Sequence, residues 1–324
     1  MSENPSIEVH LTNDDLRGAL ERDVRAGLTA EQKTLPPVWF YDARGSELFD
    51  DITRLPEYYL TRAERRLLEA SSAEFAARSQ ADMLVELGAG TCDKSRVLLD
   101  AMRDEGTLRR FVPFDVSDST IWGAAKILVD DYPGLEVHAV VGDFHRHLGA
   151  IPGGGRRAVA FLGSTLGNLT PVQRKRFFFD LDCAMTTDDR LVIGTDLVKE
   201  PERLVAAYDD AAGVTAEFNR NVLRVLNREL DAHFDVERFE HVARWNEEDS
   251  WMEMRLRSTT QQSVRIDALD LEIDFCDGED IHTEISAKFT REGFEAELFA
   301  AGFVADAMWE DPEGFLLTMA TPYC

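Results

Sequence analysis

The chain has an excess of acidic over basic residues and no long hydrophobic run. Its 324 residues include 61 Asp and Glu against 35 Lys and Arg, which gives a formal net charge of −26. Nucleic acids and anionic membranes bind clustered Lys and Arg, so this charge argues against both partners. No stretch approaches the ~18 consecutive apolar residues of a membrane-spanning helix. The amino terminus, MSENPSIEVHLTNDD, lacks the basic and apolar regions of a secretory signal, so we expect a cytoplasmic protein.

Cysteine is also scarce. The chain contains four cysteines, Cys92, Cys183, Cys276 and Cys324, none of them in a Cys-x-x-Cys pair. This spacing predicts neither a zinc site nor a disulfide framework, and it is typical of reduced thiols. His145 and His147 are one residue apart, but no Cys or acid cluster accompanies them, so surface positions are favoured over metal ligation. We expect no bound metal.

An apolar strand followed by a glycine-rich turn is the most informative stretch. Leu84-Val85-Glu86-Leu87 leads into Gly88-Ala89-Gly90, where missing Cβ atoms allow a ligand to approach the backbone. A helix expected from about Lys94 directs its unpaired N–H groups toward the same place. The dinucleotide fingerprint needs a third glycine where Asp93 stands, which argues against NAD and FAD. Glu86 suits a cofactor with a cationic head, as in S-adenosylmethionine; the alternative is a tight turn that binds no ligand.

Two further predicted strands end in acids. The strand at 111–114 leads to Asp115, which can hydrogen-bond both hydroxyls of a ribose. The strand at 135–141 leads to Asp143 and Phe144, which can accept from an adenine amino group and lie against the base. Each acid alone could be a helix cap or a solvated loop residue. Ligands of open α/β sheets bind at the carboxyl ends of the strands, so three successive acids there favour a cofactor site.

The order of elements predicts two domains. Strands alternate with helices between residues 61 and 198, which is typical of a parallel sheet. Thr61 to Glu64 is predicted to be a capping box that starts a helix. A helical region from Pro201 to about Leu230 then leads to four alternating stretches, which predict an antiparallel meander. The expected elements are helices at 16–28, 61–78, 94–104, from 171 and at 290–301, and strands at 158–163, 191–195, 239–245, 251–257, 263–266, 269–275, 304–309 and 315–320.

Five longer motifs carry a resemblance to a known family. They are Trp39-Phe40-Tyr41-Asp42 with Gly45-Ser46-x-Leu48-Phe49, Leu55-Pro56-Glu57-Tyr58-Tyr59-x-Thr61-Arg62, Gly163-Ser164-Thr165-x-Gly167-Asn168, Asp196-Leu197-Val198-Lys199, and Thr283-Glu284-Ile285-Ser286-x-Lys288-Phe289. In these motifs the chain resembles, over essentially its whole length, the S-adenosylmethionine-dependent histidine-specific N-alpha-methyltransferases of ergothioneine biosynthesis. The resemblance implies three methyl transfers to the alpha-amino group of L-histidine, giving the betaine hercynine.

The same resemblance implies the fold. We expect an α/β protein with a class I methyltransferase, Rossmann-like doubly wound sheet of seven strands and a second α+β domain that binds the substrate. The ranges are 63–196 plus 289–324 for the S-adenosylmethionine-binding domain and 10–62 plus 197–288 for the substrate-binding domain. We expect a monomer with L-histidine as its small-molecule partner.

The cofactor and substrate residues follow by position. The resemblance places cofactor contacts at Gly88, Lys94, Asp115, Asp143 and Phe144, to which the strand-edge argument adds Glu86 and Gly90. Lys94 is expected to pair with the cofactor's carboxylate. The substrate contacts fall on Tyr58, Asn168, Tyr208, Met254, Glu284 and Ser286, with Tyr41 close to the amine.

The residue types suit these roles. Asn168 can accept from the alpha-amine and hold its lone pair on the axis of the reacting methyl group, and the face of Tyr41 attracts a quaternary ammonium. Glu284 and Ser286 share one side of an extended segment, where they can bind the two imidazole nitrogens. Two alternatives stay open: methylation of another aromatic amino acid such as tryptophan or tyrosine, and a binding module without catalysis.

Overall fold

The computed structural model describes residues 5–323, and the chain divides into two compact units. Unit 1 contains Met1–Thr12, Leu60–Leu197 and Phe289–Cys324, and unit 2 contains Asn13–Tyr59 and Val198–Lys288. These bounds differ from the ranges expected from the sequence at residues 10–12, 60–62 and 197, all of which belong to unit 1. The roles expected for the two ranges stay predictions.

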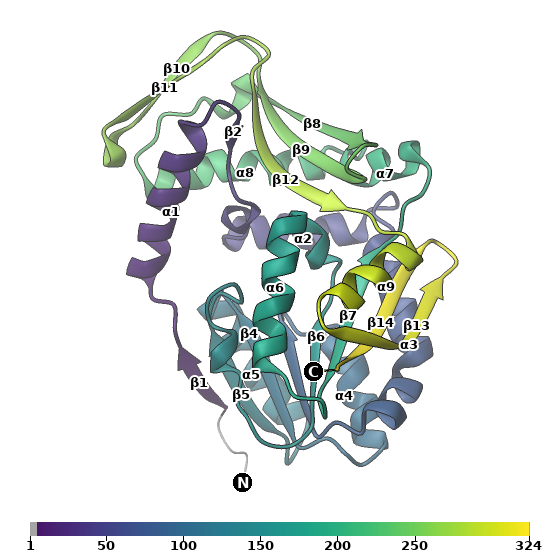
Figure 1. Ribbon diagram of the computed structural model, residues 1–324. Coiled ribbons are helices and arrows are strands. Elements are labelled where there is room, and N and C mark those ends of the chain that lie inside the picture. The colour runs from purple at the N-terminus through teal and green to yellow at the C-terminus, as the bar shows by residue number, and fades with distance from the viewer. Residues whose placement is uncertain (1–4, 324) are drawn as a thin grey trace. The chain divides into compact units, whose positions relative to one another are not determined.

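Unit 1 is built on one eight-stranded sheet in the order β1-β5-β4-β3-β6-β7-β14-β13 (Figure 1). All neighbours are parallel except β14, which is antiparallel to both β7 and β13. Its strands are β1 (Ser6–Val9), β3 (Met83–Leu87), β4 (Arg110–Asp115), β5 (Glu136–Val141), β6 (Arg157–Phe161), β7 (Arg190–Asp196), β13 (Phe303–Asp311) and β14 (Phe315–Pro322). Its helices are α3 (Leu60–Ser79), α4 (Ser95–Asp104), α5 (Asp118–Asp131), η2 (Leu148–Ala150), η3 (Thr165–Asn168), α6 (Pro171–Ala184) and α9 (Arg291–Ala300).

The strand order reverses at β3. The chain runs outward from β3 to β4 and β5, then returns to β6 on the other side of β3. In doubly wound sheets such a reversal opens a crevice at the carboxyl ends of the strands. The predicted α/β doubly wound fold is therefore confirmed, and the glycine turn after β3 lies at the point where such folds bind ligands.

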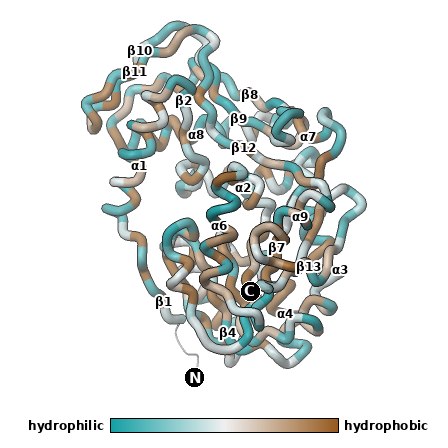
Figure 2. Tube along the Cα trace, in the orientation of Figure 1, coloured by the Kyte–Doolittle hydropathy of each residue, from teal (hydrophilic) through white to brown (hydrophobic). Residues whose placement is uncertain are grey.

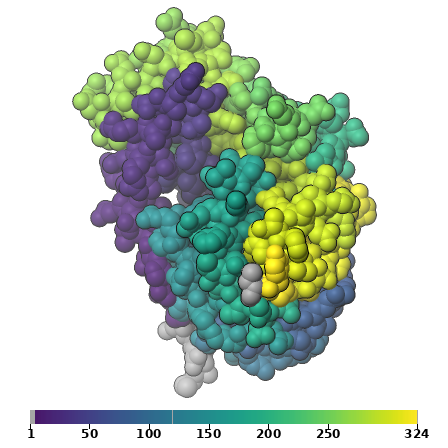
Figure 3. All heavy atoms as spheres, viewed as in Figure 1, coloured from purple at the N-terminus to yellow at the C-terminus, as the bar shows by residue number. Residues whose placement is uncertain are grey.

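Helices cover both faces of this sheet. Helices α6 and α9 lie on one face, and α3 and α4 lie on the other (Figure 1). Arg174 of α6 pairs with Glu297 of α9 at 2.6 Å, and the space-filling view shows the yellow carboxyl-terminal segment packed against the teal atoms of α6 (Figure 3). Strands β3 and β6 are buried along their whole lengths, and hydrophobic residues follow the central strands (Figure 2). A parallel sheet covered on both faces requires such continuous apolar strands.

Unit 2 holds a four-stranded sheet in the order β2-β12-β9-β8 and a separate hairpin of β10 and β11 (Figure 1). Its strands are β2 (Lys33–Thr34), β8 (Phe239–Asn246), β9 (Trp251–Ser258), β10 (Gln262–Ile266), β11 (Leu271–Phe275) and β12 (Asp280–Ala287). Its helices are α1 (Asn13–Leu28), η1 (Pro37–Phe40), α2 (Ala43–Arg54), α7 (Pro201–Tyr208), α8 (Val214–Glu229), η4 (Val236–Arg238) and η5 (Asp267–Leu269).

One sequence-based expectation about these elements is wrong, and two others gain detail. The expected seven-stranded core is present in the order β5-β4-β3-β6-β7-β14-β13, and the short, largely exposed β1 adds an eighth strand beside β5. The four-strand meander does not form, because β10 pairs with β11 alone and β9 pairs with β8 and β12. The expected helical region at 201–230 contains two helices, α7 and α8, and Asp210 accepts from the N–H groups of Val214 and Thr215 at the start of α8.

Two further observations concern the described part of the chain. Between residues 5 and 323, no helix combines the length and apolarity needed to cross a bilayer. Cys92, Cys183 and Cys276 are free thiols. Cys324, the fourth cysteine of the sequence, lies outside the described residues.

Candidate active site

The glycine turn after β3 leaves open space beside its backbone. Gly88 and Gly90 have φ of +71° and +51°, and a Cβ on either would meet no atom within 4 Å. L side chains rarely adopt this left-handed conformation, so glycine is favoured at both positions. Gly88 N–H donates to the carbonyl of Phe114 at 2.8 Å, which ties the turn to the end of β4. The turn therefore combines a fixed backbone with room for a ligand.

Asp115 at the end of β4 is bonded to the same turn. One carboxylate oxygen accepts from Gly90 N–H and the other from Ser117 N–H, both at 2.9 Å. Burial raises the pKa of Asp115, while these backbone donors oppose the rise. A carboxylate oxygen can accept more than one hydrogen bond, so Asp115 keeps the capacity to bind hydroxyl groups.

Asp143 and Phe144 follow β5 in an ordered turn. Asp143 accepts from His145 N–H at 2.8 Å, and its own N–H donates to Nδ1 of His147 at 3.0 Å. The ring of Phe144 packs edge-on against Phe161, with centroids 5.2 Å apart. His147 was predicted to be a surface residue, and its ring accepts a hydrogen bond from the backbone of this turn.

Glu86 at the end of β3 is buried and faces into unit 1. Its side chain is 4% exposed and accepts from the Ser95 hydroxyl at the start of α4. Removal from water raises the pKa of Glu86 to about 8, and this effect outweighs the opposing bond from Ser95 and charge of Lys94. A carboxyl group with a pKa of about 8 is mostly protonated at neutral pH.

Glu64 is a buried carboxylate that sequence reasoning assigned wrongly. The predicted capping box is absent because α3 begins at Leu60, which puts Thr61 inside the helix. Glu64 has no exposed surface; it pairs with Lys94 Nζ at 2.5 Å and accepts from Gly163 N–H at 2.7 Å. Glu64 therefore connects helix α3 to the segment before α4 and to the turn after β6. The expected pairing of Lys94 with a cofactor carboxylate stays a prediction.

Asn168 ends the short helix η3, which follows a strained turn. Gly163 and Ser164 both have left-handed φ, +78° and 57°, and a left-handed serine is uncommon. Ser164 Oγ accepts from Asp196 N–H at 3.2 Å, which ties this turn to the end of β7. Such backbone strain often accompanies functional sites. Asn168 is half-buried and lies at the same edge of the sheet as Asp115 and Asp143.

In unit 2 the structure brings together several of the expected substrate residues. Tyr208, the last residue of α7, has its hydroxyl 2.7 Å from Ser286 Oγ on β12. Tyr58 packs edge-on against Tyr208, with ring centroids 6.2 Å apart. Both tyrosines are 7% exposed. The buried ammonium of Lys288 donates to the hydroxyls of Tyr208 and Ser286 at 2.8 and 3.0 Å, so polar groups converge here, which suits the recognition of a small polar molecule.

Glu284 and Met254 are directly opposite each other in the antiparallel pair of β12 and β9. A register shift between His282 and Glu284 precedes this pair, and such bulges can redirect a side chain beside a binding site. Burial raises the pKa of Glu284 to about 8, although the charge of Lys288 acts in the other direction. Met254 is 2% exposed and supplies an apolar surface next to the carboxyl group.

Tyr41 belongs to an aromatic group in unit 2. Its ring lies edge-on to Phe49 and Phe218, with centroids 5.7 and 5.4 Å away, and Phe49 in turn contacts Tyr58 at 6.3 Å. Tyr41 is 40% exposed. An exposed aromatic face of this kind can contact a cation. Phe49, which belongs to a motif of the resemblance but was assigned no role, contacts both Tyr41 and Tyr58.

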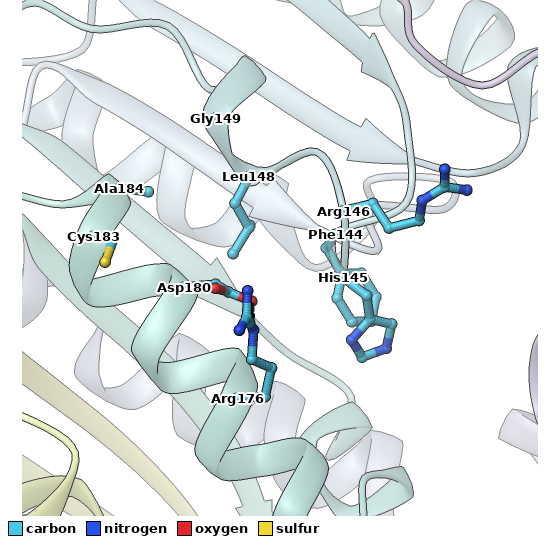
Figure 4. Close-up of a pocket in the computed structure, with 9 residues that line it drawn as sticks. All are labelled: Phe144, His145, Arg146, Leu148, Gly149, Arg176, Asp180, Cys183 and Ala184. Atoms are coloured by element: carbon cyan, nitrogen blue, oxygen red, sulfur yellow. Dashed lines mark hydrogen bonds and ion pairs between the residues drawn. The ribbon is translucent and has the colours of Figure 1, made fainter.

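A hollow of about 250 Å³ lies in unit 1 beside Phe144. Figure 4 shows Phe144 and His145 from the loop after β5 and Arg176 and Asp180 from α6 around it. Arg176 pairs with Asp180 at 2.7 Å, so its charge is already balanced within α6. The lining includes neither Gly88 nor Asp115, so this hollow is distinct from the glycine turn. Among the described residues no group of three or more His, Cys, Asp or Glu could hold a metal ion.

Similarity to known proteins decides the family. Residues 20–321 match the family described as "Histidine-specific methyltransferase, SAM-dependent". The chain belongs to this family. It is 57% identical over 316 residues to the histidine N-alpha-methyltransferase of Mycolicibacterium smegmatis, covering 97% of this chain and 98% of the relative. The protein of that name from Mycobacterium tuberculosis is 55% identical over the same shares. Ergothioneine biosynthesis protein 1 of Neurospora crassa is 29% identical over 60% of this chain and 23% of its own length.

Family members depend on S-adenosylmethionine, and unit 1 fits that cofactor. The open, left-handed turn at Gly88 and Gly90 can approach a ligand closely, and Asp115 beside it offers carboxylate oxygens. The turn lies at the reversal of strand order, where doubly wound folds bind nucleotides. Unit 1 thus has a turn that fits the cofactor of this family, and unit 2 has a polar and aromatic cluster.

Proposed function

We propose that this protein transfers methyl groups from S-adenosylmethionine to the alpha-amino group of L-histidine and proceeds to the trimethylated product, hercynine. The observation that carries the proposal is the 57% identity, over 97% of the chain, to a histidine N-alpha-methyltransferase. A similar relative, a second histidine N-alpha-methyltransferase, matches over the same share of the chain. The cytoplasmic location and monomeric state expected from the sequence stay predictions.

We assign the cofactor to the strand ends of unit 1. Gly88 and Gly90 make room for it, Asp115 accepts from its ribose hydroxyls, and Asp143 and Phe144 bind its base. Lys94 and Glu86 lie beside the same turn; we assign Lys94 to the carboxylate of the cofactor and Glu86 to its cationic head. When bound, the cofactor supplies an electrophilic methyl group on a sulfonium. The residues of the protein then serve to position the amine and to exclude water.

Asn168 and Tyr41 act on the reacting amine. The side-chain carbonyl of Asn168 accepts an N–H of the amine and aligns its lone pair with the methyl group; such alignment contributes up to ~7 to 11 kcal/mol. After the third transfer no N–H remains, and the face of Tyr41 contacts the quaternary ammonium. With its lone pair free, the primary amine has two N–H groups and the monomethylated amine has one, so Asn168 can orient both. The dimethylated amine has no N–H in its reactive form, so the face of Tyr41 and the contacts to the rest of the substrate position it for the third transfer.

The cluster of unit 2 selects the substrate. Tyr58 and Tyr208 donate to the carboxylate of the amino acid, and Glu284 and Ser286 bind the two imidazole nitrogens. Met254 packs against the ring. A site built to bond a ring N–H rejects rings without one, because the buried polar groups would then lose their partners.

Product analysis tests the proposal. The purified protein is incubated with S-adenosylmethionine and a mixture of the twenty amino acids, and the products are identified by mass spectrometry. We expect methylation of histidine alone, on the alpha nitrogen. Methylated tryptophan or tyrosine in place of histidine would replace the assigned substrate, and no methylated amino acid at all would refute the proposed function.

A further inference from the structure

Glu64 contacts two parts of the proposed site, yet the function proposed above gives it no task. Its side chain has no exposed surface. One carboxylate oxygen, Oε2, pairs with Lys94 Nζ at 2.5 Å, and the other, Oε1, accepts from Gly163 N–H at 2.7 Å. A Cβ on Gly163 would lie 3.4 Å from Lys94 Nζ. The carboxylate, the ammonium and the turn after β6 therefore meet at one place in unit 1.

Gly194 on β7 leaves the room that this carboxylate fills. A Cβ on Gly194 would lie 2.2 Å from Glu64 Oε1, which is too close for a real contact. Burying a carboxylate is costly unless a cation and hydrogen bonds compensate, and Glu64 has both in Lys94 and Gly163. The surrounding segments of unit 1 thus fix the position of the carboxylate.

The contact with Lys94 bears on the cofactor. The side chain of Lys94 is 26% exposed, and its ammonium has three hydrogens, so it can donate to Glu64 and to a ligand together. A lysine side chain has much rotamer freedom, and pairing with a fixed carboxylate removes this freedom before a ligand binds. Such preorganisation lowers the entropic cost of binding.

Glu64 acts on a ligand of Lys94 in two opposing ways. Its negative charge neutralises part of the lysine charge, which weakens the attraction of a second carboxylate. Solvent screens this effect, because the ammonium is partly exposed. The restriction that Glu64 imposes on the rotamers of Lys94 is not screened. Orientation therefore outweighs repulsion, and removal of Glu64 is expected to weaken the binding of a ligand carboxylate.

The contact with Gly163 bears on the acceptor of the reacting amine. Gly163 and Ser164 both have left-handed φ, and such strain persists only where the surroundings fix it. The carbonyl of Ser164 accepts from Gly167 N–H at 2.9 Å, one residue before Asn168. The bond from Gly163 N–H to Glu64 therefore fixes the start of the segment that ends in Asn168.

We infer that Glu64 is a positioning residue that holds Lys94 for the cofactor carboxylate with one oxygen and holds the turn before Asn168 with the other. The inference rests on the proposed function, because it takes Lys94 to bind the cofactor and Asn168 to bind the amine. One buried carboxylate then fixes, within unit 1, both a contact of the methyl donor and the acceptor of the amine.

The first test measures how strongly the protein prefers a cofactor that has a carboxylate. Calorimetry without histidine gives the affinities of S-adenosylmethionine and of decarboxylated S-adenosylmethionine, and their ratio is the carboxylate preference. Lys94→Met should reduce this preference roughly tenfold or more. Glu64→Met keeps an unbranched side chain and removes both acceptors. It should reduce the preference roughly threefold or more.

Controls separate positioning from a general loss of structure. Glu69→Met is the matched control, because Glu69 lies on the same helix in an exposed pair with Arg65, and it should leave the preference unchanged. In the Lys94→Met background, Glu64→Met should change the preference less than about twofold, because Glu64 acts through Lys94. Equal losses of affinity for both cofactors, a larger preference in Glu64→Met, or additive losses in the double variant would overturn the inference.

The second test measures the turn. Amide hydrogen exchange of residues 163–168, followed by mass spectrometry, should be faster in Glu64→Met than in the wild type and in Glu69→Met. At saturating cofactor and histidine, kcat of Glu64→Met should fall roughly tenfold or more, because Asn168 loses its alignment. Unchanged exchange of this segment, or an unchanged kcat, would contradict the role of Glu64 at the turn.

Glu64→Gln keeps the test decisive if Glu64→Met folds poorly. The glutamine amide has one acceptor oxygen, so it cannot accept from both Lys94 and Gly163. We expect this variant to lose at least one of two properties, the carboxylate preference and the protection of the turn, and retention of both would overturn the inference. Failure of the wild-type protein to bind S-adenosylmethionine or to methylate L-histidine would instead refute the proposed function, which distinguishes the two failures.

Discussion

The buried Glu86 makes the stability of unit 1 depend on pH in a defined direction. Its pKa rises from 4.5 to about 8 on folding, because burial removes the carboxyl from water. Between these values the folded chain holds one proton more than the unfolded chain. The free energy of unfolding therefore decreases as pH rises, by about 1.4 kcal/mol per pH unit. The stabilisation is complete below pH 4.5 and is lost as pH rises through 8.

Replacing Glu86 by Gln isolates this contribution. Glutamine keeps the shape and can still accept from Ser95, but it does not titrate. Between pH 5.5 and 7.5 the wild type should lose about 2.5 kcal/mol more unfolding free energy than Glu86→Gln. Urea unfolding followed by circular dichroism at both pH values measures the free energy of unfolding of each protein. The contributions of the other titrating groups are common to both proteins, so they cancel when the two pH-dependent changes are subtracted. Glu295→Gln, at an exposed position of α9, is the matched control. Parallel pH dependence in wild type and Glu86→Gln would refute the reasoning.

Three further predictions concern the assigned site. Asp115→Ala should weaken S-adenosylmethionine binding by about 1.5 to 3 kcal/mol, roughly tenfold or more, in calorimetry; an unchanged affinity would remove Asp115 from the cofactor site. Asn168→Ala should lose most turnover in a methyl-transfer assay, and retention of full activity would contradict its role. Glu284→Ala should lower histidine turnover by about 1.5 to 3 kcal/mol in transition-state binding, while tryptophan and phenylalanine gain relative to histidine in competition; an unchanged preference would disprove selection by Glu284.

The strand ends and the glycine turn of unit 1 were predictable from the sequence. The apolar stretches before Glu86, Asp115 and Asp143 were predicted to be strands, and each of them is a strand in the structure. Gly88 and Gly90 adopt the left-handed turn that their lack of a Cβ allows. The central strands of unit 1 could be predicted because strands buried on both faces of a parallel sheet are continuously apolar in sequence. Their roles toward the cofactor stay predictions.

The features that could not be predicted depend on contacts between residues that are distant in sequence. β1 is a short strand with exposed side chains, so only its pairing with β5 reveals it. Glu64 looks like a helix cap locally, but it is partnered by Lys94 and by Gly163, far along the chain. The pairing of β9 with β12 rather than with β10 places Met254 opposite Glu284, and an alternating pattern cannot specify which strand is the neighbour.

The number and position of the methyl groups test the central claim most directly. The purified protein is incubated with excess S-adenosylmethionine and L-histidine, and the product is analysed by tandem mass spectrometry with quantitation of S-adenosylhomocysteine. The account predicts trimethylhistidine with all three groups on the alpha nitrogen, and three equivalents of S-adenosylhomocysteine per product. Methylation of an imidazole nitrogen, accumulation of mono- or dimethylhistidine under excess cofactor, or unmodified histidine would contradict it.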